Sequence, residues 1–122
     1  MNFNDKVPIY YQIKQYIYGE IIGENLKAGQ KLPAIRQLAV TLTVNVNTIQ
    51  RALSELISEG VLVTQRGKGN FVTTDVQLLV ALKKRVVTAQ FSELYDKLIT
   101  LKISPPEMVQ YLQDYIDQRK EA

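Results

Sequence analysis

The sequence lacks cysteine, histidine and tryptophan altogether among its 122 residues. Without cysteine there is no disulfide, thiolate metal ligand or thiol nucleophile, and without histidine there is no imidazole ligand or imidazole general base. These absences remove most of the side chains on which enzyme chemistry depends. We therefore expect that the protein is not an enzyme and that it binds no metal and no cofactor.

Long apolar runs are also missing. A membrane-spanning helix needs about 18 or more consecutive apolar residues, and Lys83, Lys84 and Arg85 interrupt the longest candidate. The N-terminus does not show the basic segment followed by an apolar segment that marks a signal peptide. We expect a cytoplasmic protein with no membrane contact.

Acidic residues are too few to balance the basic ones in the first part of the chain. Residues 1–74 contain eight basic and five acidic side chains, whereas residues 75–122 contain seven of each. The whole net charge of +3 therefore lies in residues 1–74. Such an excess suits a nucleic-acid-binding surface, although an ordinary solvated surface explains it equally simply.

Apolar periodicity predicts three helices in this basic part. The first covers Pro8 to about Ile22 and ends at Gly23, and the second lies near residues 34–42. A turn at Thr43 and Val44 leads to a third helix, which Asn45 caps and which runs to Glu59, before Gly60. The residues that we expect to be buried in the second and third helices are Ile35, Leu38, Ala39, Leu42, Ile49, Ala52, Leu53, Leu56 and Ile57.

Two β-prone runs, residues 61–65 and 70–74, follow the third helix. They are joined by Arg66-Gly67-Lys68-Gly69, whose glycines favour a tight hairpin turn. A helix-turn-helix followed by a hairpin is a winged helix. The expected fold is therefore mainly α with a small β-hairpin, and residues 1–74 form a winged helix-turn-helix domain.

Residues 75–122 are expected to form a two-helix dimerisation region. One helix covers about residues 76–101, and Ser104 and Glu107 are spaced as a capping box for a last helix that starts at Pro105. The apolar surface of this region is too wide for one short partner helix to cover. The candidate dimerisation residues are Leu79, Leu82, Val86, Phe91, Leu94, Tyr95, Leu98, Met108, Leu112 and Tyr115, and we expect Met108, Leu112, Tyr115 and Ile116 to form the buried stripe of the last helix.

Four ordered segments carry a resemblance to a known family. They are Pro8–Ile13, Leu32–Ala39, Asn45–Leu53 and, in the hairpin region, Glu59–Leu62 with Gly67–Val72. Together they strongly resemble the GntR family of bacterial transcription regulators. The short tail is similar to that of the YtrA subfamily, in which a small C-terminal region dimerises. The resemblance implies a sequence-specific DNA-binding regulator, a repressor that binds a pseudo-palindromic operator as a homodimer.

Two positions depart from the family pattern. Val46 stands where many relatives have arginine, so one common base or phosphate contact is absent, and Ala34 stands where serine is frequent. The preferred operator should therefore differ from those of arginine-bearing relatives.

The third helix carries the residues suited to reading bases. Asn47, Thr48 and Gln50 lie in its first turns, where side chains reach base edges in the major groove. Asparagine and glutamine pair best with adenine, so we expect an adenine-containing half-site. Asn45 is better explained as a cap, and Thr48 has an equally good structural role. The candidate DNA-binding residues are Tyr10, Arg36, Asn45, Asn47, Thr48, Gln50, Arg51, Arg66, Gly67 and Lys68.

The remaining candidates suit the DNA backbone. Arg36 and Arg51 are expected to face phosphates, and the basic tip Arg66–Lys68 can approach phosphates or a minor groove. Tyr10 suits a phosphate contact and packing equally well. Glu55 and Glu59 share a helix face, which we interpret as a solvated pair and not as a catalytic dyad.

Two questions stay open at this stage. A winged helix can also act as a protein-interaction module without binding DNA, with the hairpin as its docking edge. No pocket motif identifies a small-molecule effector, so the effector is unknown.

Overall fold

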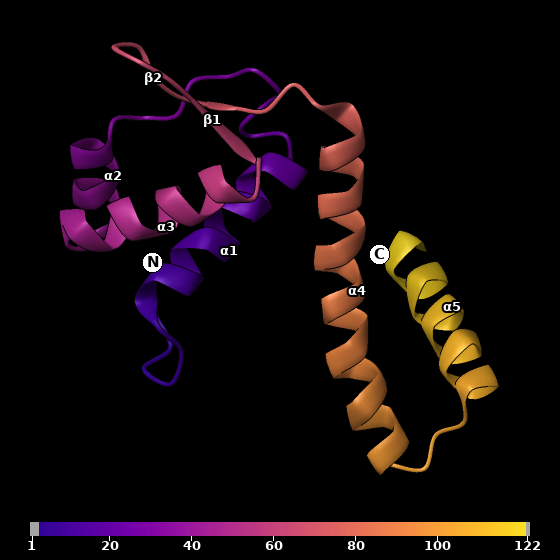
Figure 1. Ribbon diagram of the computed structural model, residues 1–122. Helices are drawn as coiled ribbons and strands as arrows, with labels where there is room; N and C mark the ends of the chain where they lie inside the picture. Colours follow the sequence, from indigo (N-terminus) through magenta and orange to yellow (C-terminus); the bar gives the residue numbers. More distant parts are fainter. Residues whose placement is uncertain (1–2, 122) are drawn as a thin grey trace. The chain divides into compact units, whose positions relative to one another are not determined.

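The computed structural model describes residues 3–121, which form five helices and one two-stranded hairpin (Figure 1). The elements in chain order are α1 (Ile9–Ile22), α2 (Ile35–Leu42), α3 (Val46–Ser58), β1 (Leu62–Gln65), β2 (Gly69–Val72), α4 (Val76–Thr100) and α5 (Pro105–Glu121). The expected fold class, mainly helical with a small hairpin, is confirmed. The chain divides into two compact units between Lys84 and Arg85, within α4 and beyond residue 74.

The core of the first unit lies among α1, α2 and α3, with the hairpin packed beside α3. Its fully buried side chains include Ile13, Ile17, Ile49 and Leu56. These residues recur at helical spacing, so each helix turns one apolar stripe inward.

Two residues expected in this core are not fully buried. Ile35 is half-buried, and Ile57 is 36% exposed. The buried stripe of α3 passes through Leu53 and Leu56, and Ile57 lies about 100° further round the helix, at the edge of the stripe.

The hairpin is anchored by residues 23–34, the connector between α1 and α2, in which the sequence predicted no strand. β1 pairs antiparallel with β2, with Leu62 opposite Val72. The other edge of β2 bonds to the connector, where the Leu32 N–H donates to the Asn70 carbonyl at 2.9 Å and the Val72 N–H donates to the Gln30 carbonyl at 2.9 Å. β2 is therefore hydrogen-bonded along both of its edges, to β1 on one side and to the connector on the other.

The start of α4 belongs to the first unit. Asp75 caps this helix, because its Oδ1 accepts a hydrogen bond from the Leu78 N–H at 3.1 Å. Leu82 is only 3% exposed within the single chain. Its expected role in dimerisation stays a prediction, although a side chain already covered by its own chain offers little surface to a second copy.

The second unit contains the rest of α4 and α5. The expected capping box is present: the Ser104 N–H donates to Glu107 Oε1 at 3.3 Å, and the Glu107 N–H donates to Ser104 Oγ at 3.4 Å. Within the described residues, none of the helices is both long and apolar enough to cross a membrane.

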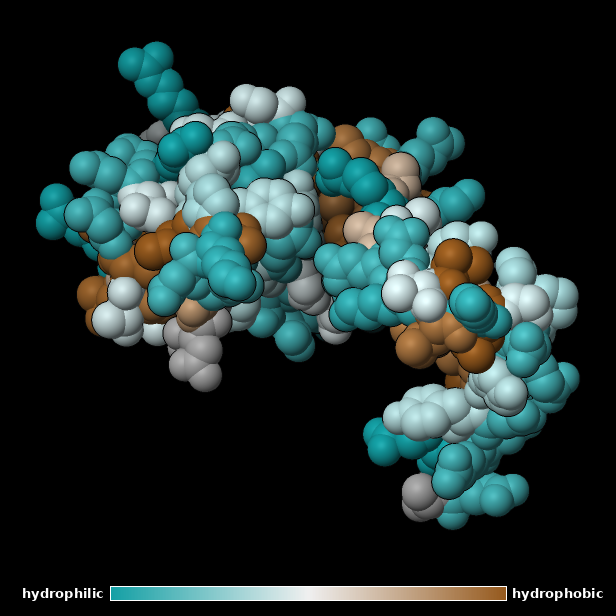
Figure 2. Space-filling model, turned by 90° about the horizontal axis from the view of Figure 1, so that it is seen from below, coloured by the Kyte–Doolittle hydropathy of each residue, from teal (hydrophilic) through white to brown (hydrophobic). Residues whose placement is uncertain are grey.

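The expected buried stripe of α5 is wrong for the single chain. No described residue of α5 is buried; Met108 is half-buried, and Leu112, Tyr115 and Ile116 are 42%, 57% and 39% exposed. One neighbouring helix cannot cover apolar faces this wide. Figure 2 shows hydrophobic side chains, in brown, at the surface of the α4 and α5 part of the molecule.

Candidate nucleic-acid interface

The first turn of α3 presents polar side chains, and a side-chain cap fixes where this helix begins. Asn45 caps it as expected, with its side-chain oxygen accepting from the Asn47 N–H at 2.7 Å. Thr43 ends α2 with a left-handed φ of +57°, a conformation that terminates a helix. Asn47 and Gln50 are exposed, and Thr48 is half-buried.

An open groove of about 710 Å³ lies between the start of α2, α3 and the hairpin tip. It brings together five of the candidate DNA-binding residues, which are Arg36, Gln50, Arg66, Gly67 and Lys68. Among the described residues that line this groove, hereafter the basic groove, none is acidic. The groove therefore combines basic side chains with an amide side chain on α3, which suits DNA phosphates and base edges.

The sequence did not single out Lys31, which also lines the basic groove. Lys31 lies in the connector and forms an isolated bridge with Phe71 of β2. The signal available in the sequence was its position directly before the Leu32–Pro33 pair that opens the second helical segment. Its place on the groove depends on the pairing of the connector with the hairpin, which local sequence did not indicate.

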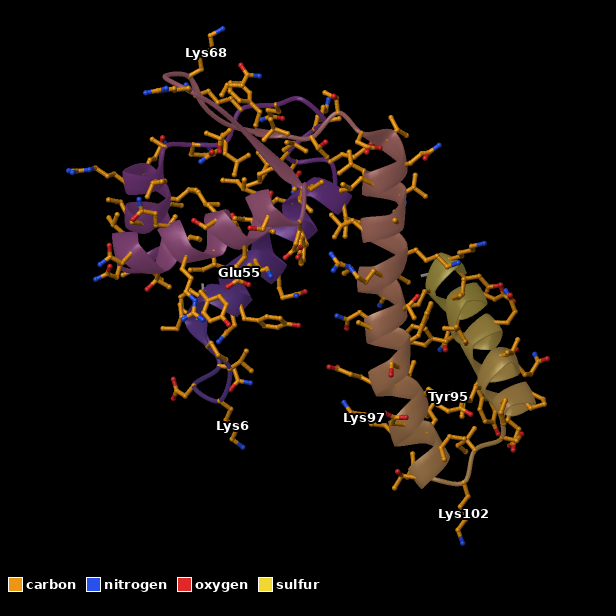
Figure 3. The ribbon with its side chains drawn as sticks, viewed as in Figure 1. Lys6, Glu55, Lys68, Tyr95, Lys97 and Lys102 are labelled. Carbon is orange, nitrogen blue, oxygen red and sulfur yellow. The ribbon has the colours of Figure 1, made fainter. Side chains whose placement is uncertain are left out.

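The hairpin tip is shaped by glycine. Gly67 has a φ of +77° with open space around it, and Gly69 has a φ of +120°. A Cβ added at Gly69 would lie 2.9 Å from Lys31 Cε, the flexible end of a side chain that can move aside, so it is the φ of this position that favours glycine. Figure 3 shows Lys68 at the tip, extending away from the body of the hairpin.

Another group of candidates lies at the start of α1 and along α3. The guanidinium carbon of Arg51 lies 3.7 Å from the centroid of the Tyr10 ring. Arg51 Nε is also 3.7 Å from Glu55 Oε2, one turn further along α3. Tyr10, Asn45, Asn47, Thr48 and Arg51 do not line the basic groove, so the candidate residues fall into two adjoining groups on the same unit.

Glu55 and Glu59 do not form the solvated pair that we expected. Both contact Lys14 of α1, whose Nζ donates to Glu55 Oε1 at 3.1 Å and lies 2.6 Å from Glu59 Oε2. Tyr18 donates its hydroxyl proton to Glu59. The Lys14 side chain is only 11% exposed. The carboxylates therefore neutralise a buried lysine, which the sequence gave no reason to pair with them.

The pKa of Lys14 depends on its burial and on its two carboxylate partners. Burial alone would lower the pKa of Lys14, but the hydrogen bonds that its ammonium donates to Glu59 and Glu55 outweigh burial and raise the pKa above its ordinary value. Lys14 therefore stays charged at neutral pH and ties α1 to α3.

The second unit holds the candidate dimerisation residues. An apolar groove of about 480 Å³ separates α4 from α5, and Figure 3 shows Tyr95 on the side of α4 that faces α5. Seven of the ten candidates line this groove, hereafter the apolar groove: Phe91, Leu94, Tyr95, Leu98, Met108, Leu112 and Tyr115. Val86 is half-buried outside it, and Leu79 lines a different hollow beside α1.

Comparison with known proteins gives a consistent result. Residues 9–72 match the family model described as bacterial regulatory proteins, gntR family. The HTH-type transcriptional repressor YtrA of Bacillus subtilis is 35% identical over 88 residues, which are 71% of this chain and 68% of YtrA.

Solved structures support the same relationship. A GntR family transcriptional regulator from Listeria monocytogenes has a TM-score of 0.86 and 33% identity, over 92% of this chain and 98% of that chain. The DNA-binding domain of AraR, solved in complex with the operator ORR3, has a TM-score of 0.54 and 30% identity, over 60% of this chain and 88% of that chain.

Proposed function

This chain belongs to the gntR family of bacterial transcription regulators, and we propose that it binds a pseudo-palindromic operator as a homodimer and acts as a repressor. The observation that carries the proposal is the basic groove, in which Arg36 of α2, Gln50 of α3 and Lys68 of the hairpin turn line one concave surface. The operator complex of the related AraR domain supports a DNA ligand for this surface.

The candidate residues divide into those that contact phosphates and those that contact base edges. Arg36, Arg51, Arg66 and Lys68 bind phosphates, which supplies most of the affinity and makes it dependent on salt. Asn47 and Gln50 contact base edges in the major groove, and Thr48 packs at the helix start. Gly67 lets the backbone of the tip approach the duplex closely.

Dimerisation is assigned to the second unit. The apolar groove is lined by Phe91, Tyr95, Leu112 and Tyr115, which are between 42% and 57% exposed in the single chain. A second copy would remove this surface from water, and burial of apolar area stabilises association. Twofold symmetry then places two copies of α3 on two half-sites about one helical turn of DNA apart, or a multiple of it.

The alternative is a protein-interaction module that uses the hairpin as a docking edge. It is weaker, because the connector already pairs with β2 and the hairpin tip is basic and glycine-rich. A small-molecule effector stays unassigned.

Selection of bound sequences from a random duplex library tests the proposal. We expect an enriched inverted repeat that contains adenine, binding that weakens steeply as salt increases, and a complex of two chains per duplex by sedimentation. Failure to bind any duplex at low ionic strength would contradict DNA binding, and a single chain at every concentration would contradict the dimer.

A further inference from the structure

Arg51 lies between an aromatic ring and a carboxylate that come from different helices. The Tyr10 ring of α1 faces its guanidinium at 3.7 Å, and Glu55 Oε2 of α3 lies 3.7 Å from its Nε. Even so, 63% of the Arg51 side chain remains exposed. The guanidinium is therefore held in place and still accessible to a ligand.

The two contacts fix different features of the guanidinium. An arginine on the face of a tyrosine ring is attracted by the negative face of the π-system, which keeps the guanidinium plane near the ring. The carboxylate of Glu55, 3.7 Å from Nε, adds an electrostatic attraction from the next turn of α3. Together they leave Arg51 fewer orientations than a free surface arginine has.

Glu55 is itself fixed from the interior of the first unit. Its other oxygen, Oε1, accepts a hydrogen bond from Lys14 at 3.1 Å, and Lys14 is bound by Glu59 at 2.6 Å. Figure 3 shows Glu55 where α3 passes α1. The position of the Arg51 side chain is thus set by contacts that reach back to a buried lysine.

Ordering a long side chain on binding has an entropic cost, and a side chain ordered in advance avoids part of it. We propose that Tyr10 is a positioning residue, whose ring, opposite the anchored Glu55, holds Arg51 as a preformed phosphate-binding group beside the recognition helix α3. This inference rests on the proposed function. It assigns Tyr10 a role through Arg51 in place of a phosphate contact of its own.

A double-mutant cycle on the selected operator duplex tests it. Tyr10→Leu should weaken binding about three- to tenfold, with the salt dependence of the wild type, because Arg51 keeps its charge. Arg51→Met should reduce the slope of log affinity against log salt by about 0.9 for each protomer. In the Arg51→Met background, Tyr10→Leu should cause no further loss.

Two variants separate positioning from general damage. Tyr10→Phe keeps the ring and should recover most of the affinity that Tyr10→Leu loses, although it lacks the hydroxyl. Tyr11→Leu, at the 46% exposed neighbouring tyrosine, should bind as the wild type does. Thermal unfolding of every variant identifies any that lose the fold.

Three outcomes would overturn the inference. Tyr10→Leu could bind as tightly as the wild type, or it could weaken binding equally with and without Arg51, which would make the ring an independent contact. Tyr10→Phe could lose as much affinity as Tyr10→Leu, which would assign the effect to the hydroxyl. In all three outcomes the wild type still binds the operator, so the proposed function stands. A wild type that binds no duplex would contradict both the proposed function and the role of Tyr10.

Discussion

Gln50 and Arg36 line the same basic groove but differ in what they can distinguish. A glutamine amide donates and accepts in one plane and so discriminates adenine from other bases, whereas a phosphate carries no sequence information. Gln50→Ala should reduce discrimination at one operator position by about 1–3 kcal/mol, and Arg36→Ala should weaken all sequences alike. Binding to duplexes that carry single substitutions measures both effects. A uniform loss for Gln50→Ala would show that our assignment of base contact is wrong.

The pH dependence of stability at the residue scale centres on Lys14. Its pKa is raised in the folded protein, so its contribution to the free energy of unfolding is complete below the ordinary lysine pKa of about 10.4 and declines as pH rises above that value. Lys14→Met leaves Glu55 and Glu59 without their buried partner and should cost about 1–3 kcal/mol at neutral pH.

Urea unfolding of the wild type and Lys14→Met from pH 7 to pH 11 would measure this contribution. The difference between them should stay constant to about pH 10 and then decrease. Lys27→Met, at an exposed lysine of the same unit, serves as the control and should change stability little. A difference that rises with pH would contradict the ion-pair explanation.

At the scale of the element, α3 depends on its cap. The Asn45 side chain satisfies the Asn47 N–H at 2.7 Å. Asn45→Ala should destabilise the first unit by about 1 kcal/mol, whereas Asn45→Ser should retain most of the stability because serine also caps well. Differential scanning calorimetry measures the change. If Asn45→Ser restores stability but not DNA affinity, Asn45 also contacts the operator.

Local elements were predictable where the chain carries its own signals. The Asn45 cap and the Ser104 capping box act over two or three residues, so the sequence located the helix starts well. The pairing of residues 29–32 with β2 and the Lys14 contact with Glu55 join residues about 40 positions apart. Such contacts depend on how whole helices pack, and periodicity within one segment contains no information about them.

The candidate site also divides into residues that local sequence signals identified and contacts between distant segments that they did not. The resemblance and the helix periodicity identified Arg36, Gln50 and Lys68, and the structure places them on one groove. Neither source identified Lys31 as a further lining residue, or indicated that Tyr10 covers Arg51. Both facts arise from the spatial approach of segments that are separate in sequence.

At the scale of the whole molecule, the second unit leaves large aromatic side chains exposed in the single chain. Phe91 and Tyr95 of α4 and Tyr111 and Tyr115 of α5 remain between 48% and 57% exposed around the apolar groove. Monomeric proteins rarely leave large aromatic side chains clustered at the surface. The same residues that lack a cover in one chain are therefore those that a second chain would bury.

Tyr95→Glu tests this inference at the molecular scale. A carboxylate at the centre of an apolar interface loses its hydration without a partner, so association should weaken strongly. The variant should sediment as a monomer, keep its helical content by circular dichroism, and bind a single half-site as weakly as the wild type does while losing tight binding to the full operator. Gln90→Glu adds the same charge at an exposed position outside the apolar groove and should remain dimeric. A Tyr95→Glu protein that stays dimeric would place the interface elsewhere on the chain, and the exposed aromatic residues of α4 and α5 would then need another partner.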